Sequence, residues 1–519
     1  MKVIKNINKI LKYCIFIVIF FMLVGITYSY FVANITGVET DTTITLDSGK
    51  MEIEFDGGNG IEATGLYPSD EAFGTKDFTV TGTSTIEQSE MYYKISLIID
   101  ENGISKNAIS FTMTSTNTSD NGYIVPAIPD DIYVGTNRIE LGVGKFIGDV
   151  DGAIHSYQMK FYYYETGNDQ SGDINQTFKA HILIENYADP CVSGNCLKDI
   201  ILSEAGGPSV IEAKGNPSFA AISSSSDSGL YAMEDEYGTS YYFRGNNSLL
   251  KNNLIFGGFQ WKIVRINGDG SIRILYNGTE EEFKQNGTMS GEDDDVYINL
   301  DKWNEYTDDI KYVGYMYGGP NGEASKSRIE AVTNDTSSNI KIVLDEWYEE
   351  NILSKTFENK IADNLFCNDR LLSSEVGGYN ISPGYGNFPG ENYYAGFYRL
   401  YLNKAPTLKC GFINDQFTVT KKHIGNGALT YPVGLITADE VSIAGLLFDT
   451  SNRDNYLYFN YLYWTMTPFR ENLYGVSSSS KISTYFINDE YVAIRPVINL
   501  KPDVVVTGSG TLTNPYVVD

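Results

Sequence analysis

The sequence predicts an N-terminal export segment, then an all-β sandwich domain, then a mixed α+β domain. Three observations predict this order: a basic and then apolar start, a stretch in which apolar residues alternate with polar ones between Gly, Asn and Asp clusters, and a longer remainder that adds two amphipathic helices to this alternation. We place the boundaries at 1–33 for the export segment, 34–190 for the sandwich, 191–228 for a linker and 229–519 for the last domain.

The first 33 residues have the features of a secretory signal. Four lysines come first, and an uncharged apolar run follows over residues 13–26. Small residues at Thr27 and Ser29 predict cleavage between Ser29 and Tyr30. The alternative is an uncleaved membrane anchor, because residues 13–33 carry no charge and reach the roughly 20 residues that a spanning helix needs. Under either alternative the rest of the chain lies outside, which predicts an extracellular or cell-surface location.

The composition is that of a folded, acidic protein. The chain has 519 residues, of which 42% are hydrophobic, and a formal net charge of -28. This hydrophobic content is enough to build buried cores. The charge excludes nucleic acid as a partner, because phosphate backbones are bound by Lys and Arg, and it disfavours binding along an anionic membrane surface. We therefore expect contact with a membrane only through the N-terminal segment.

The cysteines agree with export. Outside the export segment there are four, Cys191, Cys196, Cys367 and Cys410, and an even number in an exported chain predicts two disulfides. Pairing of neighbours, Cys191 with Cys196 and Cys367 with Cys410, is the simplest of three connectivities. Zinc binding by the same four is the alternative, although no CxxC spacing occurs and no His is nearby in the sequence.

Residues 34–190 are expected to form strands throughout. Ile44 and Leu46 alternate with polar residues before an Asp-Ser-Gly turn, and Ile53 and Phe55 alternate on the return, which predicts a hairpin. Similar strands follow at 92–99, 109–113, 157–164 and 178–184. Several short strands separated by turn residues are typical of a β-sandwich.

The stretch 191–228 is expected to be a linker that contains a short Cys loop. Its Gly-Gly-Pro sequence at 206–208 and its run of serines at 223–226 are typical of linkers. Residues 197–202, between the Cys loop and the Gly-Gly-Pro sequence, predict one or two helical turns.

The last domain, 229–519, combines a hairpin with two helices. Alternation over 259–263 and 272–276, on either side of Asn-Gly-Asp-Gly, predicts a hairpin. One helix is expected over 339–351, where Ser338 caps an amphipathic pattern. The other is expected over 437–447, where Thr437 is the cap and Glu440 completes a capping box.

The N-terminal motifs resemble those of a known family. Gly25–Phe31, followed by a strand that ends at Met51–Phe55, is similar to the start of the camelysin and TasA group of Gram-positive bacteria. The resemblance implies export through a dedicated signal peptidase and a β-sandwich fold. Some members of the group assemble into extracellular fibres, and camelysin is described as a peptidase.

The last domain resembles a set of uncharacterised surface proteins of low-GC Gram-positive bacteria. The motifs that carry this resemblance are Gly229–Gly238, Phe259–Arg265, Tyr312–Gly318, Phe366–Arg370, Tyr431–Ala444 and Ile494–Leu500. Their order also resembles the C-type-lectin-like fold of formylglycine-generating enzymes, on Leu435–Glu440, Tyr463–Thr465 and Ala493–Arg495. The paired catalytic cysteines of those enzymes are absent, so the resemblance implies the fold and not the activity.

Few residues suggest catalysis. The three histidines, His155, His181 and His423, show no metal-binding spacing, and we predict no catalytic residue and no cofactor or metal. Acidic clusters at 280–282 and 292–295 are expected to be solvated loops, with a calcium site as the alternative.

Aromatic residues give the binding prediction. The segment 377–401, between Cys367 and Cys410, is rich in Tyr, Gly and Asn. We predict that Tyr393 and Tyr394 contribute to a binding surface and that Trp464 lines it or is buried beneath it, because aromatic side chains suit sugars and protein partners. The alternative is that these residues pack in an irregular core.

The function predicted from these observations is non-catalytic. We expect an exported bacterial surface protein that binds a surface glycan or a protein, or that associates with itself, in adhesion or in a matrix. The alternatives are a secreted camelysin-like metallopeptidase or other hydrolase, and a subunit of an extracellular fibre.

Overall fold

The chain forms two compact units, Met1–Ala188 and Asp189–Asp519. The structure is a computed structural model, and it describes residues 42–46, 51–56, 61–84, 90–105, 108–117, 122–134, 138–147, 150–165, 169–187, 191, 194–291, 296–378, 394–421 and 424–518. The export segment 1–33, with the predicted cleavage site at Ser29 and Tyr30, lies outside the described residues. No helix among the described residues is both long and apolar enough to cross a membrane.

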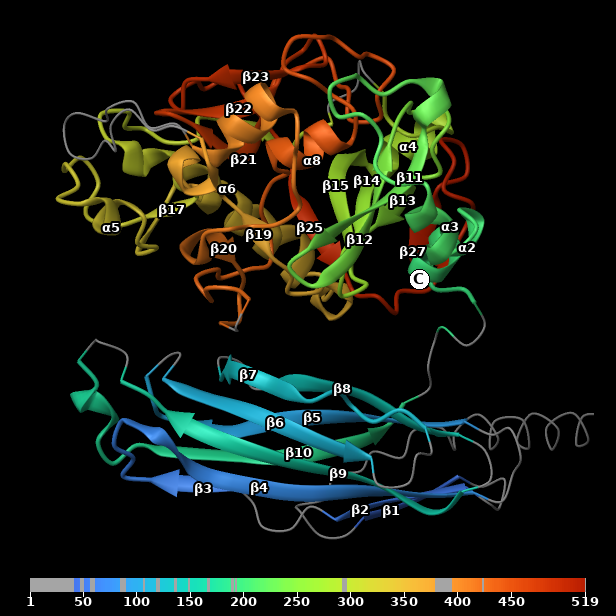
Figure 1. The fold of residues 1–519 in the computed structure, drawn as a ribbon, viewed down its shortest axis with the longest axis vertical. Helices are drawn as coiled ribbons and strands as arrows, with labels where there is room; N and C mark the ends of the chain where they lie inside the picture. Colours follow the sequence, from blue (N-terminus) through green and yellow to red (C-terminus); the bar gives the residue numbers. More distant parts are fainter. Residues whose placement is uncertain are drawn as a thin grey trace, which may run out of the picture. The chain divides into compact units, whose positions relative to one another are not determined.

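The first unit consists of two antiparallel sheets that pack face to face (Figure 1). The six-stranded sheet has the order β1 (Thr42–Leu46), β2 (Met51–Asp56), β4 (Ser69–Ser84), β9 (Val150–Tyr163), β6 (Ile109–Asn117) and β7 (Ile128–Tyr133). The four-stranded sheet has the order β3 (Ile61–Thr64), β10 (Thr177–Asn186), β5 (Glu90–Asn102) and β8 (Arg138–Ile147).

Alternating apolar residues from both sheets make the core of this unit. Val80 and Phe111 from the larger sheet and Leu97 and Ile182 from the smaller one are buried in one cluster. The expected first hairpin is present, with Ile44 opposite Ile53. The all-β sandwich predicted for this part of the chain is therefore the observed architecture.

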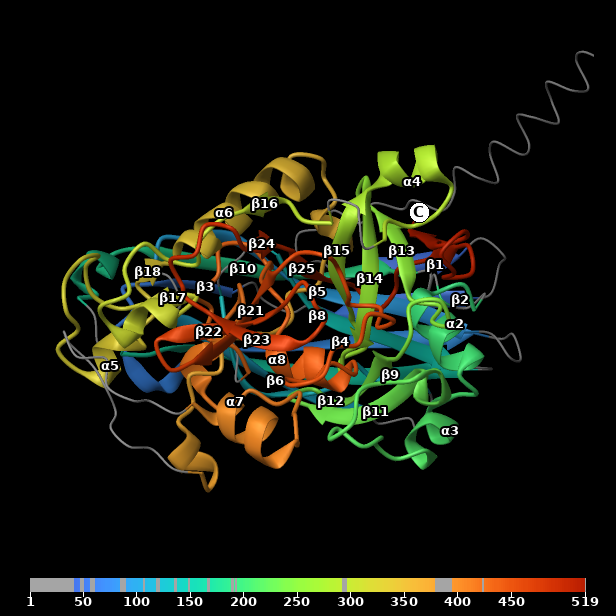
Figure 2. The same cartoon turned by 90° about the horizontal axis from the view of Figure 1, so that it is seen from above.

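The second unit is also mostly β-sheet, with short helices around it (Figures 1 and 2). The predicted hairpin at 259–276 is the centre of its largest sheet, where β14 pairs with β15, β13 and β12. This eight-stranded sheet contains β11 (Gly229–Asp235), β12 (Gly238–Arg244), β13 (Asn253–Phe256), β14 (Phe259–Ile266), β15 (Ile272–Thr279), β25 (Val497–Leu500), β26 (Val506–Thr507) and β27 (Tyr516–Val518). A five-stranded sheet has the order β16 (Asn299–Leu300), β24 (Ala493–Ile494), β21 (Tyr463–Phe469), β22 (Asn472–Val476) and β23 (Ile482–Tyr485). Two short ladders pair β17 (Met316–Tyr317) with β18 (Thr336–Ser337) and β19 (Phe366–Cys367) with β20 (Gln416–Phe417).

Both predicted helices begin at their predicted caps. The Ser338 hydroxyl accepts from the Lys341 N–H at 3.3 Å and starts α6 (Asn339–Tyr348), which continues as a π-helical turn to Leu353. Thr437 and Glu440 form the expected capping box of α8 (Ala438–Ile443). This helix is shorter than the predicted 437–447 and is buried along its whole length. The other α-helices in the described part of the chain are α2 (Leu197–Glu204), α3 (Pro208–Ala213), α4 (Glu280–Asn286), α5 (Arg328–Ala331) and α7 (Ala395–Phe397).

The prediction that residues 191–228 form a linker is wrong. It belongs to the second unit, where it forms α2 and α3, and Leu197, Ile201 and Ile211 are buried in the core. The Ser223 hydroxyl also accepts from the side-chain amide of Asn455 at 3.0 Å. Gly and Ser suggested a flexible stretch, but Leu197, Ile201 and Ile211 supply a packing face.

The core of the second unit is rich in aromatic residues. It holds all four tryptophans of the chain, Trp261, Trp303, Trp347 and Trp464. Trp303 and Trp464 are in edge-to-face contact, with ring centroids 6.1 Å apart. This core supports α8 and β21, which lie beside each other and form part of the site described next (Figures 1 and 2).

Candidate functional site

Two disulfides fix separate parts of the second unit. Cys191 pairs with Cys196, and Cys367 pairs with Cys410, as expected from the cysteine count. The second bond joins β19 to the segment that follows Lys409 and closes a loop with a sequence separation of 43. The zinc alternative is wrong, because all four sulfurs are in disulfides and zinc is bound by thiolates.

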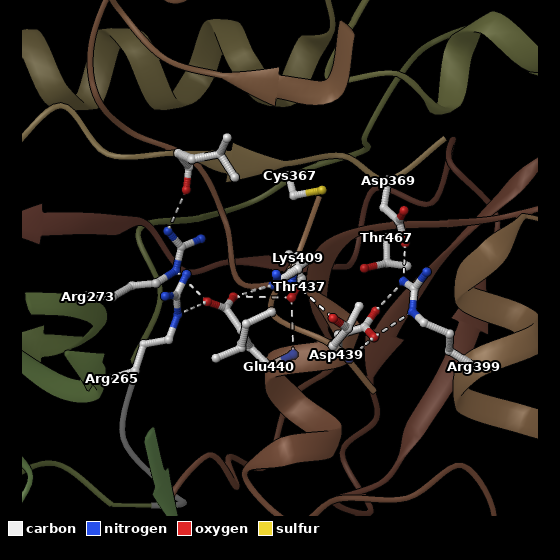
Figure 3. A pocket seen from close by; sticks show the side chains of 13 residues that line it. Arg265, Arg273, Cys367, Asp369, Arg399, Lys409, Thr437, Asp439, Glu440 and Thr467 are labelled. Carbon is white, nitrogen blue, oxygen red and sulfur yellow. Dashed lines mark hydrogen bonds and ion pairs between the residues drawn. The ribbon is translucent and has the colours of Figure 1, made fainter. Parts of the chain in front are cut away.

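A polar pocket of about 20 Å³ lies beside the second disulfide (Figure 3). Cys367 lines it, and so does the exposed Lys409, so the pocket reaches the surface. The complete lining is Arg265, Arg273, Leu365, Cys367, Asp369, Arg399, Thr407, Leu408, Lys409, Thr437, Asp439, Glu440 and Thr467. Three arginines and three carboxylates in so small a space make it an electrostatic site.

Glu440 is the centre of one half of the pocket. It lies in the first turn of α8, where its Oε2 accepts from the Thr437 N–H at 2.9 Å. Its Oε1 accepts from Arg265 Nε at 3.0 Å and lies 2.7 Å from Arg273 Nε, in an ion pair without hydrogen-bond geometry. Burial alone would raise the pKa of Glu440, but Arg273 and Arg265 outweigh it and hold this pKa below its usual range. Glu440 is therefore a fixed anion.

The strands behind Glu440 hold the two arginines in place. Arg265, on β14, also donates from Nη1 to Asp235 Oδ2 at 2.8 Å. Arg273, on β15, donates from Nη1 to the Leu365 carbonyl at 3.1 Å. Burial lowers the pKa of Arg273 to about 10, and Glu440 opposes this shift, so Arg273 stays cationic at neutral pH.

Arg399 is the centre of the other half. Its Nε and Nη2 donate to the two oxygens of Asp439 at 3.0 and 2.9 Å, and Nη2 also donates to Asp369 Oδ2. Asp439 accepts a further bond from the Thr407 N–H at 2.9 Å. Figure 3 shows Arg265 and Arg273 on one side of Glu440, and Arg399 beside Asp439 and Asp369 on the other.

The Asp369 carboxyl holds its proton more tightly than a free carboxyl does. Burial raises its pKa to about 6; Arg399 opposes the shift, and the neighbouring Asp439 and Asp415 add to it. Its backbone has a φ of 58°, in the left-handed region that Asp and Asn tolerate better than most residues. Asp369 therefore gains a proton in a mildly acidic medium, unlike Glu440.

Of the two predicted binding tyrosines, the one that the structure describes, Tyr394, does not line the pocket. Tyr394 is 3% exposed and belongs to the core of the second unit, so its predicted place on a binding surface is wrong. Tyr393 lies outside the described residues. Trp464 is fully buried, and its Nε1 donates to the Asp301 carbonyl at 2.9 Å.

The described histidines do not line the pocket. His155 is buried in the sandwich, stacks on Phe146 and is hydrogen-bonded to the Tyr93 hydroxyl. His181 is hydrogen-bonded to Asp100 with its Nδ1 2.8 Å from Oδ2. His423 lies outside the described residues.

The structure describes one of the two acidic clusters, and that one is part of a helix cap. Residues 280–282 form the first turn of α4, where Glu282 completes a capping box with Thr279. Residues 292–295 lie outside the described residues. Of the described part of the chain, the grouping compact enough for a metal ion is Cys191, Cys196 and Asp199, and its two cysteines are joined to each other.

Sequence reasoning missed most of the pocket. Arg265, Asp369, Asp439 and Glu440 belong to motifs noted in the sequence, and Cys367 and Thr437 were assigned structural roles. No role was predicted for Asp369, Arg399 or Asp439. A usable signal was present for two of them, since Asp369 is two residues after a disulfide cysteine and Arg399 is the one charge in an aromatic run, Phe397–Leu402.

Comparison of the chain with protein-family models, with curated proteins and with solved structures finds no match. The geometry of the pocket is accordingly the basis for a functional conclusion.

Proposed function

We propose that this chain is an exported, non-catalytic surface protein, and that its second unit binds a ligand in the pocket between Arg265, Arg399 and Lys409. The first unit, a β-sandwich, holds that unit at the cell surface or assembles it there. The resemblance to the camelysin and TasA group and to surface proteins of low-GC Gram-positive bacteria supports the location. The two disulfides support it as well, because such bonds persist in oxidising environments.

The observation that carries this proposal is the prearranged ion-pair network of the pocket. Arg399 is held by Asp439, and Arg265 is held by Asp235 and Glu440, before any ligand is present. Donors and acceptors fixed in this way lower the entropic cost of binding a polar ligand. The lining contains threonine hydroxyls but no histidine and no free thiol.

The C-type-lectin-like fold is part of the same proposal. The residues that carry the resemblance include Leu435–Glu440 and Tyr463–Thr465, and the structure brings α8 and β21 together at the pocket. In this proposal α8 and β21 are the support of the site, and the segment 407–409 is its outer wall.

Binding can be tested with the purified full-length chain on glycan and protein arrays. We expect retention of a defined set of acidic glycans or proteins, and a loss of that retention when Lys409 is replaced by Gln. Lys326→Gln is the matched control, because Lys326 is an exposed lysine that does not line the pocket. Equal retention by both variants and by the unmodified chain would contradict a role for the pocket.

The location and the alternatives need separate measurements. Protease treatment of intact cells should remove the second unit and leave a cytoplasmic marker intact. Cleavage of a general protein substrate that a zinc chelator stops would favour the metallopeptidase alternative. Polymers seen by electron microscopy after removal of the signal would favour the fibre alternative.

A further inference from the structure

Exposed aromatic residues gather where two segments of the second unit run side by side. The segment that follows β16 lies along the segment that precedes β24. The Asp301 N–H donates to the Val492 carbonyl at 3.1 Å, and the Asn304 N–H donates to the Ile487 carbonyl at 2.9 Å. The two segments therefore share one surface, and its exposed aromatic residues are Tyr306, Phe486 and Tyr491.

A third segment, which precedes β21, extends this surface. β21 and β24 are parallel, with Tyr463 opposite Ala493, and the Ala493 N–H donates to the Leu462 carbonyl at 2.8 Å. Tyr461 and Tyr491 are each two residues before the paired residues, at the same end of the two strands. Tyr461 is exposed as well. We define the aromatic strip as the four residues Tyr306, Tyr461, Phe486 and Tyr491.

The surroundings of the aromatic strip are negative. Glu305, Asp308 and Glu490 are exposed, and Asp489 is half-buried. Lys302 is the one cation in the sequence of the segments 301–308 and 486–492. Its Nζ lies 2.5 Å from Glu305 Oε2 and 3.3 Å from Glu490 Oε1, so it bridges the two segments and balances only part of their charge.

We propose that the aromatic strip is a docking surface for a protein partner that presents Arg and Lys side chains. Groups of exposed aromatic residues mark interaction sites, and the negative face of an aromatic ring attracts a cation. The flanking carboxylates attract the same side chains and steer their approach. The strip residues do not line the pocket, so this surface goes beyond the proposed function and does not depend on it.

A cation of the chain is already held by tyrosine rings next to the strip. The Lys311 ammonium group lies over the rings of Tyr312 and Tyr317, at 5.0 and 5.7 Å from their centroids, and donates to the Pro320 carbonyl at 2.9 Å. The Tyr312 ring is in turn 5.5 Å from the ring of Tyr306, a member of the strip. The local chemistry therefore suits a cation on a tyrosine face.

Charge argues against two other occupants of the strip. A second copy of the chain has a formal net charge of -28 and would be repelled by the same carboxylates. A neutral glycan would stack on the rings, but the negative charge would not attract it. A basic segment of another protein uses both the rings and the carboxylates.

Two peptides of the same length are suitable probes for the purified full-length chain. One has three arginines spaced by Gly and Ser, and the other has citrulline in their place, which keeps the shape of arginine and removes its charge. We expect calorimetry to show saturable binding of the arginine peptide and at least about tenfold weaker binding of the citrulline peptide. Equal binding of the two peptides, or no saturable binding of either, would overturn the inference.

Variants separate the strip from attraction by net charge alone. The double variant Phe486→Ser with Tyr491→Ser removes two exposed rings and leaves every charge in place, and it should weaken binding of the arginine peptide at least about fivefold. Tyr67→Ser is the matched control, because it removes an exposed ring of the first unit, and it should leave the affinity unchanged. An unchanged affinity in the double variant would refute the site. Loss of a neutral glycan from the double variant, without any binding of the arginine peptide, would assign the strip to sugars instead.

The carboxylates have a control of their own. Glu490→Gln should weaken binding of the arginine peptide about twofold to threefold and make it less sensitive to salt. Glu281→Gln, at an exposed carboxylate of α4, should not change it. Equal effects of these two variants would contradict a role for Glu490.

The pocket and the strip can be distinguished by Lys409→Gln. This variant should leave binding of the arginine peptide unchanged, because Lys409 lines the pocket and is not part of the strip. Peptide binding that Lys409→Gln abolishes would place the peptide at the pocket and refute the strip. Peptide binding that only the strip variants weaken would support the strip, whatever the arrays show for the pocket.

Discussion

Lys262 lies directly opposite Asn253 on the paired strands β14 and β13, and its ammonium group donates to the Asn253 side-chain oxygen at 2.5 Å. A second amide oxygen, from Asn247, accepts from the same nitrogen at 2.7 Å. No carboxylate is among these partners. Burial therefore lowers the pKa of Lys262 to about 7, and the positive charge of Arg495 contributes further.

We predict that Lys262 makes the second unit more stable as the pH rises from about 7 toward 10. The unfolded chain binds a proton at this lysine throughout that window, whereas the folded chain does not, so the free energy of unfolding increases with pH. The slope from this group is at most about 1.4 kcal/mol per pH unit. When the free energy of unfolding is measured with denaturant at pH 7, 8 and 9, its increase with pH should be smaller in Lys262→Met than in the unmodified chain. In Lys326→Met, stability should increase with pH as it does in the unmodified chain. The same increase in all three proteins would refute the lowered pKa of Lys262.

Asp369 should make the second unit less stable as the pH rises through the acidic range, whereas Lys262 makes it more stable as the pH rises above 7. Its pKa in the folded chain is raised to about 6, so its protonated form favours folding, and that contribution is lost as the pH rises from about 4 through 6. Asn keeps an acceptor for Arg399 and tolerates the left-handed backbone of this position. Asp369→Asn should therefore gain stability relative to the unmodified chain between pH 4.5 and 7, by at most about 3 kcal/mol. Calorimetric melting across that range measures the gain in stability. A difference in stability between the two proteins that does not change with pH would contradict the prediction.

The two disulfides should differ in their contribution to stability. A disulfide stabilises the folded chain by reducing the conformational entropy of the unfolded chain, and the effect grows with the length of the closed loop. This stabilisation is about 4 kcal/mol for the Cys367–Cys410 bond, which has a sequence separation of 43. It is about 2 kcal/mol for the Cys191–Cys196 bond, which has a separation of 5. Replacement of each pair by Ala provides a matched comparison in denaturant unfolding. If removal of the Cys191–Cys196 bond lowers the free energy of unfolding more than removal of the Cys367–Cys410 bond, local packing and not loop size determines the contribution of each bond.

Tyr394 and Trp464 should behave as core residues. Tyr394→Ala and Trp464→Ala should each lower the free energy of unfolding by about 3–5 kcal/mol, because each removes a buried aromatic ring. Tyr491→Ala is the control, since its ring is 77% exposed, and it should change stability by less than about 0.5 kcal/mol. Loss of array ligands without loss of stability in Tyr394→Ala would restore its predicted binding role.

Limited proteolysis should separate the two units near the Ala188–Asp189 boundary and not within 206–226. The fragment of the second unit should retain α2 and α3, because Leu197, Ile201 and Ile211 are packed in its core. Mass spectrometry of the resistant fragments identifies the cut. A resistant fragment that begins near Gly229 would show that these helices are dispensable.

The sequence predicted those features that depend on near neighbours. The Ser338 and Thr437 caps, the hairpin at 259–276 and the β-sandwich follow from patterns within about ten residues. The two disulfides follow from the even cysteine count and local pairing. Each of these features depends on the side chains of residues that are close together in the sequence.

The pocket could not be predicted in the same way. Arg265 is 175 residues from Glu440, and Arg399 is 40 from Asp439, so the ion pairs exist only after the fold has formed. In the sequence these residues are isolated charges. Richness in aromatic residues was also misleading for Tyr394, because Tyr is common both in cores and at binding surfaces.

The distribution of tryptophan gives the second unit its own spectroscopic signature. All four tryptophans are buried in that unit, so the tryptophan fluorescence of the intact chain reports it alone. The sandwich contributes to circular dichroism but not to tryptophan emission. Recording both signals during one denaturation would therefore resolve the unfolding of each half without a label and without cutting the chain.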